Sequence, residues 1–116
     1  MNRSIRLRLN DIIRAIDGAE ETIAGIRFET FQEVYHMPRT VERCIEIVSE
    51  ATKHIPDNLK SRYPKIPWHQ IAGIGNILRH DYDLVDDRII WEVATVYFPR
   101  LRAVVIELRL LVEDDD

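Results

Sequence analysis

The stretch that decides the fold class is residues 5–26, IRLRLNDIIRAIDGAEETIAGI. Its apolar residues follow one another at alternating steps of four and three, which places them on one side of an α-helix: Ile5, Leu9, Ile12, Ile16, Ala19, Ile23 and Ile26. A continuous apolar stripe of this kind needs partner helices to cover it. The stretch therefore predicts a long first helix in a helical bundle.

A second helical region follows after Gly25, at the end of the stripe. Thr30 and Glu33 form a possible capping box, which predicts that the second helix opens there. Pro38 interrupts the region, so we expect either one kinked helix or two abutting helices. The helical stripe then continues through Val41, Ile45, Val48, Ala51 and Ile55.

The second half of the chain begins with a loop between Pro56 and Pro67. Pro67 suits the first turn of a third helix that ends near His80 and carries Trp68, Ile71, Ile74 and Leu78 as apolar positions. Asp86 is placed to cap a short helix with Ile90, Trp91 and Val93. Pro99 opens the last helix, with Leu101, Val104, Leu108 and Leu111 as its stripe. The predicted fold class is all-α, a compact bundle of four to five helices.

Length and composition agree with one folded domain. The chain has 116 residues, of which 46% are apolar and 31% charged, which favours a single helical domain over residues 1–112 followed by a solvated acidic tail, 113–116. Cys44 is the only cysteine, which excludes an internal disulfide and indicates the cytoplasm. No run of residues has the length of a membrane span, and none has the apolar core of a signal peptide. The net charge of −4 means that any RNA contact must come from a local site.

The stretch that predicts chemistry is GNILRHDY, residues 75–82. Asn76, Arg79 and His80 stand at i, i+3 and i+4, so they share one helical face, opposite the apolar Ile74, Ile77 and Leu78. A neutral imidazole can take a proton from a ribose 2′-hydroxyl, and a guanidinium can stabilise the charge that builds on the phosphate. These residue types predict RNA cleavage without metal or cofactor, with a 2′,3′-cyclic phosphate as product.

Structural interpretations of the same residues stay open. Cations in the last turn of a helix, such as Arg79 and His80, also stabilise the helix end without any catalytic role. His69 and His80 are about 16 Å of helix rise apart, too far to share a metal ion. We expect Trp68 and Trp91 to fill the core, His36 and His54 to lie on the surface, and Cys44 to pack and not to react.

The same stretch resembles the HepT-like HEPN family, whose signature is an arginine, four to six residues, a histidine, any residue and a tyrosine near the end of a bundle helix. His80-Asp81-Tyr82 matches the second half of the signature. The resemblance extends through Ser49-Glu50-Ala51, Ile66-Pro67-Trp68 and Trp91. It implies a ribonuclease toxin that acts at a homodimer cleft, with His80, Arg79 and Asn76 as candidate catalytic residues. It also implies a minimal nucleotidyltransferase antitoxin that transfers AMP to Tyr82.

The chain departs from the family at one position, because Gly75 stands where the family arginine is expected, five residues before His80. Arg79 lies about 40° around and about 6 Å along the helix from that position, and its long side chain could return the guanidinium to nearly the same place. The alternatives are a catalytic arginine from elsewhere, Arg43 or Arg39, or a catalytically silent HEPN module that binds the nucleotidyltransferase. We also expect a homodimer, because the first and last helices together carry a large apolar surface.

Overall fold

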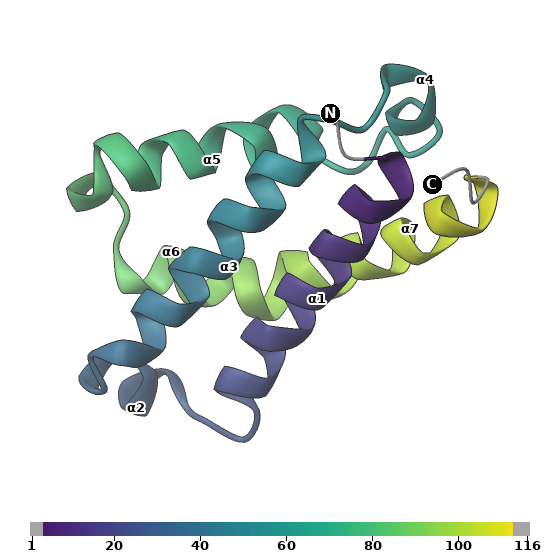
Figure 1. Cartoon of the computed structure of the whole chain (residues 1–116). Helices are drawn as coiled ribbons and strands as arrows, with labels where there is room; N and C mark the ends of the chain where they lie inside the picture. The colour runs from purple at the N-terminus through teal and green to yellow at the C-terminus, as the bar shows by residue number, and fades with distance from the viewer. Residues whose placement is uncertain (1–3, 113–116) are drawn as a thin grey trace.

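The computed structural model, which describes residues 4–112, contains four long helices (Figure 1). These are α1 (Ile5–Ile23), α3 (His36–Thr52), α5 (Trp68–His80) and α7 (Phe98–Leu111). Shorter elements connect them: α2 (Phe28–Glu33), α4 (Asp57–Lys60), the 3₁₀ turn η1 (Tyr82–Leu84), α6 (Asp87–Glu92) and the π-helical turn η2 (Val93–Tyr97). Residues 4–112 contain no strand, and the all-α bundle is confirmed. The predicted acidic tail lies outside the described residues.

Helix α1 follows the predicted stripe from Ile5 to Ile23, whereas Ile26, predicted as the last member of the stripe, lies beyond the end of the helix. Ser4 caps it by accepting a hydrogen bond from the Leu7 N–H at 3.1 Å, and Gly25, with φ 70°, follows its end. The middle of the stripe is buried in the core, whereas its outer members Ile5 and Ile26 are half-buried. The helix packs against α3 and α7 of the same chain; in Figure 1 α3 runs alongside α1 and α7 crosses it. The stripe is therefore covered within the chain, and the reason given above for a dimer is wrong as far as α1 is concerned.

The predicted capping box is wrong. Thr30 and Glu33 lie inside α2, which already begins at Phe28. The start of α2 is set by tertiary packing, because the Phe28 and Phe31 rings contact the Trp91 ring at centroid distances of 5.9 and 5.1 Å. Of the two arrangements expected around Pro38, the structure has two separate helices: α2 ends at Glu33 and α3 begins at His36.

The remaining elements agree with the sequence in outline. The stripe of α3 is buried as predicted, and Ile55 just beyond its end is 2% exposed. The loop before α5 contains the single helical turn α4. Asp86 caps α6 by accepting from the Ile89 N–H at 2.9 Å. In α7 Leu101 and Leu108 are buried as predicted, but Val104 is half-buried beside the fully buried Val105, and Leu111 is exposed.

Several single-residue predictions can be placed in this fold. His36 and His54 are exposed, as expected. Trp68 and Trp91 are half-buried and pack against the core without being enclosed by it. Among residues 4–112 no helix combines the length and the apolar character needed to cross a membrane.

Candidate active site

The candidate site is built on α5, whose first turn is anchored by a tryptophan. The Trp68 indole N–H donates to two backbone carbonyls of the preceding loop, those of Lys60 at 3.0 Å and Tyr63 at 3.1 Å. Its ring packs against the core at the same time. This combination fixes the start of α5 against the loop that leads into it.

The middle of α5 crosses α3 at a very close contact. Gly75 is buried there, and its N–H donates to the Ser49 hydroxyl at 3.2 Å. The same hydroxyl donates to the carbonyl of Ala72 at 2.8 Å, so one side chain of α3 bonds two backbone groups of α5. Ser49 is 1% exposed. The position at which the family arginine is expected therefore faces the interior of this protein.

The last two turns of α5 bring the predicted site residues together on the surface. Asn76, Arg79 and His80 are all exposed. The Arg79 guanidinium donates to the Asn76 Oδ1 at 2.8 Å, so these two side chains form a unit. His80 follows directly in the chain, and its side chain forms no hydrogen bond or ion pair within residues 4–112. Both cations stand in the last turn, where the helix dipole favours positive charge.

Ile77 does not lie on the buried face as predicted. It is 41% exposed, whereas Leu78 is 8% exposed. Gly75 and Leu78 are the buried residues of α5, three positions apart, and Ile77 lies about 100° around the helix from Leu78. The predicted polar face is thus interrupted by one exposed apolar side chain.

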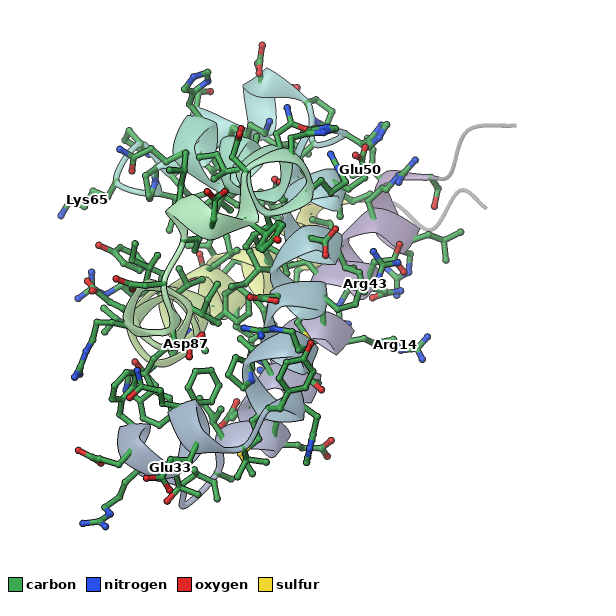
Figure 2. The ribbon with its side chains drawn as sticks, turned by 90° about the vertical axis from the view of Figure 1, so that its left-hand side faces the viewer. Arg14, Glu33, Arg43, Glu50, Lys65 and Asp87 are labelled. Carbon is green, nitrogen blue, oxygen red and sulfur yellow. The ribbon has the colours of Figure 1, made fainter. Side chains whose placement is uncertain are left out.

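Arg79 also lines a groove between three helices, which the sequence did not indicate. The other basic residues of the groove are Arg8 from α1 and Arg43 from α3, and its acidic residues are Asp11, Glu46 and Glu50. The Nε atom of Arg8 is buried without a hydrogen-bond partner among the described residues, and Arg43 forms no ion pair within them. Figure 2 shows Arg43 and Glu50 along the same side of α3. The three arginines are far apart in the sequence, so no local motif could have linked them.

Among the carboxylates of this groove, Glu50 has surroundings that favour its ionised form. Partial burial acts to raise its pKa, but the hydrogen bond from His54 (3.3 Å) and the charges of Lys53 and Arg79 outweigh burial. The pKa of Glu50 therefore lies below its usual value. The groove holds an ionised carboxylate beside its arginines, and a bound anion would have to be accommodated next to it.

The alternative arginine Arg39 is occupied elsewhere. Its guanidinium bonds Glu42 at 2.8 and 3.0 Å and Asp87 at 3.3 Å, and it lies 5.3 Å from the centre of the Tyr35 ring. These contacts join α3 to the start of α6. Of the two alternatives considered from the sequence, only Arg43 lies in the groove with Arg79.

Tyr82 and Cys44 differ in how accessible their reactive atoms are. Tyr82, the first residue of η1, is 73% exposed, so its hydroxyl is accessible to a modifying enzyme. Cys44 is half-buried, and burial raises the pKa of its thiol despite the nearby charge of Arg43. A raised pKa lowers the thiolate fraction and so the reactivity of the thiol. Among residues 4–112, no three His, Cys, Asp or Glu side chains are grouped as metal ligands.

Comparison with known proteins shows the family of the chain. The family model described as ribonuclease HepT-like matches residues 12–108. The chain belongs to the HepT-like ribonuclease family. Among its HepT-like relatives, the "Probable ribonuclease HepT" of Thermococcus cleftensis is 37% identical over 109 residues, covering 94% of this chain and 99% of that protein. The "Putative RNase TTE0752" of Caldanaerobacter subterraneus subsp. tengcongensis is 35% identical over 100 residues, covering 86% and 89%. No solved structure matches the chain.

Proposed function

We propose that this HepT-like chain is an endoribonuclease that cleaves RNA by attack of a ribose 2′-hydroxyl on the adjacent phosphorus. The observation that carries the proposal is the exposed unit of Asn76, Arg79 and His80 at the end of α5, in which the guanidinium is held by Asn76 at 2.8 Å. His80 takes the proton of the 2′-hydroxyl, and the O2′–P bond forms while the P–O5′ bond breaks. The leaving 5′-oxygen takes a proton from water, which gives a 2′,3′-cyclic phosphate and a 5′-hydroxyl.

Arg79 stabilises the negative charge that builds on the phosphate oxygens in this reaction. Asn76 positions Arg79, because its Oδ1 restricts the rotamers that a long exposed side chain would otherwise explore. The reaction needs no cofactor and no metal ion. RNA is the substrate class, and the single cysteine supports the cytoplasm as the place of action.

Regulation and assembly follow the family resemblance. We propose that a minimal nucleotidyltransferase antitoxin silences the toxin by AMP transfer to Tyr82: the phenol oxygen attacks the α-phosphorus of ATP, pyrophosphate leaves and the phenol proton goes to a base. The exposure of Tyr82, three residues after Arg79, supports this acceptor.

A homodimer remains part of the proposal. It is supported by exposed apolar side chains on α5, η1, α6 and η2, which are Ile77, Leu84, Ile89, Val96 and Tyr97.

The second candidate function is a catalytically silent module that only binds the nucleotidyltransferase. It is favoured by one observation, the burial of Gly75 at the position where an arginine is expected. The two functions differ in a single measurable property, cleavage of RNA by the isolated chain.

The deciding experiment compares His80→Ala and Arg79→Ala with the unaltered protein on single-stranded RNA in the presence of EDTA. We expect losses of about 10²–10⁴-fold for His80→Ala and of similar size for Arg79→Ala. His69→Ala is the matched control, because His69 is an exposed histidine of the same helix. Circular dichroism should show unchanged helix content in all variants. A wild-type chain without activity, or products without a 2′,3′-cyclic phosphate, would contradict the proposed reaction.

A further inference from the structure

The crossing of α3 and α5 leaves no room for a side chain at position 75. A Cβ atom added to Gly75 would lie 2.5 Å from the Ser49 Oγ and 2.7 Å from the Ser49 Cβ. The hydroxyl could rotate away from such an atom. The Cβ could not, because it is bonded directly to the backbone of α3 and no rotation of the side chain moves it. The Cα of Glu46, one turn earlier, would lie 3.8 Å away, which is an ordinary contact distance, so Ser49 alone obstructs the position.

We propose that Ser49 and Gly75 form an exclusive pair, and that Ser49 is a positioning residue for the cationic end of α5. Exclusion means that positions 49 and 75 cannot both carry a side chain. An arginine at position 75 requires glycine at position 49, and with Ser49 present the guanidinium must come from another turn of the helix. The positioning role rests on the proposed ribonuclease function, whereas the exclusion does not.

The positioning role follows from the two hydrogen bonds of the Ser49 hydroxyl. The hydroxyl is held by the Ala72 carbonyl and the Gly75 N–H, one helical turn before Asn76 and Arg79. Two hydrogen bonds to the backbone of α5 restrict the rotation of α5 about its own axis. They also restrict sliding of α5 against α3. Glu46 and Glu50, on either side of Ser49 in α3, line the groove with Arg79, so a rotation of α5 would move the guanidinium relative to these carboxylates.

The exclusion is tested by stability alone. Gly75→Ala should lower the urea midpoint of unfolding, because the new Cβ meets Ser49. The matched control is Gly73→Ala on the same helix, where a Cβ would meet no atom within 4 Å. The control should raise the midpoint, since alanine favours the helix over glycine. Each comparison is repeated in the Ser49→Gly and Ser49→Ala backgrounds.

In the Ser49→Gly background, Gly75→Ala should become neutral or raise the midpoint, as Gly73→Ala does. In the Ser49→Ala background it should still lower the midpoint, because alanine keeps the obstructing Cβ. A Gly75→Ala variant that is as stable as Gly73→Ala in the presence of Ser49 would overturn the exclusion. Failure of Ser49→Gly to relieve the loss would overturn it too.

The positioning role is tested by kinetics. Ser49→Ala should lower kcat by about tenfold or more with little change in KM, because a small displacement of a catalytic group reduces the rate steeply while the bound RNA contacts remain. Thr52→Ala is the matched control, since Thr52 is also a buried hydroxyl of α3 but donates to the Ser49 carbonyl of its own helix, at 2.8 Å. Equal kinetic effects of the two variants would overturn the positioning role and leave the exclusion standing.

The sharpest test moves the guanidinium. Arg79→Ala should lower cleavage by about 10²–10⁴-fold, and adding Gly75→Arg alone should not restore it. The triple variant Ser49→Gly, Gly75→Arg, Arg79→Ala should regain activity by about tenfold or more, because the new arginine has the space it needs. Rescue without Ser49→Gly, or no rescue by a folded triple variant, would contradict the proposal. A wild-type chain without ribonuclease activity would refute the proposed function and the positioning role, while the stability comparison would still decide the exclusion.

Discussion

The groove between α1, α3 and α5 makes a quantitative prediction about how the protein binds RNA. Three arginines from three helices line it: Arg8, Arg43 and Arg79. Neutralising one phosphate of a single strand changes the slope of log K against log salt by about −0.7, so three contacts give a slope of about −2. Affinity should then fall about 20-fold between about 50 and 200 mM salt.

Replacing Arg43 by alanine removes one contact and leaves a slope of about −1.4, which corresponds to a fall of about sevenfold over the same salt range. The assay is fluorescence anisotropy of a labelled single-stranded RNA, measured in the His80→Ala background so that the RNA stays intact. Arg100→Ala is the control, because Arg100 is an exposed arginine of α7 and does not line the groove. A slope that is unchanged by Arg43→Ala, or changed equally by Arg100→Ala, would refute the groove as an RNA contact.

The carboxylates of the same groove provide a test of opposite sign. Glu46 lines the groove beside the arginines, and its charge opposes that of a bound phosphate. Glu46→Gln keeps the shape of the side chain and should strengthen RNA binding several-fold, an effect that fades as salt is raised. Weaker binding in this variant would indicate that Glu46 serves the site by orienting an arginine.

Three further predictions concern assembly, modification and stability. Val96→Asp should convert the proposed dimer to a monomer in multi-angle light scattering, whereas Leu110→Asp, on an 82% exposed residue of α7, should not. Co-expression with a nucleotidyltransferase partner should add the mass of AMP to the chain, and an adduct that persists in Tyr82→Phe would place the acceptor elsewhere. Asp86→Ala removes the cap of α6 and should cost about 1 kcal/mol of unfolding free energy, or about 4 °C in Tm, and an unchanged Tm would argue against this cap.

The elements that could be predicted from the sequence are those whose signal is local. The stripe of α1 and the Asp86 cap were predicted correctly, because each depends on residues within a few turns of one another. The start of α2 was predicted wrongly at Thr30, because the rings of Phe28 and Trp91 decide it and they lie far apart in the sequence. Local periodicity also indicated that the stripe of α1 needs partners, but not that α3 and α7 of the same chain supply them.

The candidate site also has a part that the sequence predicts and a part that depends on packing between helices. The spacing of Asn76, Arg79 and His80 on one helix placed these three side chains on a common exposed surface. Arg43 was named from the sequence only as one of two alternative arginines, and Arg8 was not named, because only the packing of three helices brings them beside Arg79.

Gly75 shows most clearly why a motif has to be interpreted together with its packing. In sequence it is a missing arginine, and the simplest interpretation is a lost activity. A glycine inside a helix is destabilising by about 0.5–1 kcal/mol relative to alanine, so it persists where something offsets that loss. Here the close approach of α3 does so, with two hydrogen bonds between the Ser49 hydroxyl and the backbone of α5, each worth about 1 kcal/mol. These bonds anchor α5 one turn before Arg79, so the residue that excludes the expected arginine also fixes the turn of helix that precedes the proposed replacement.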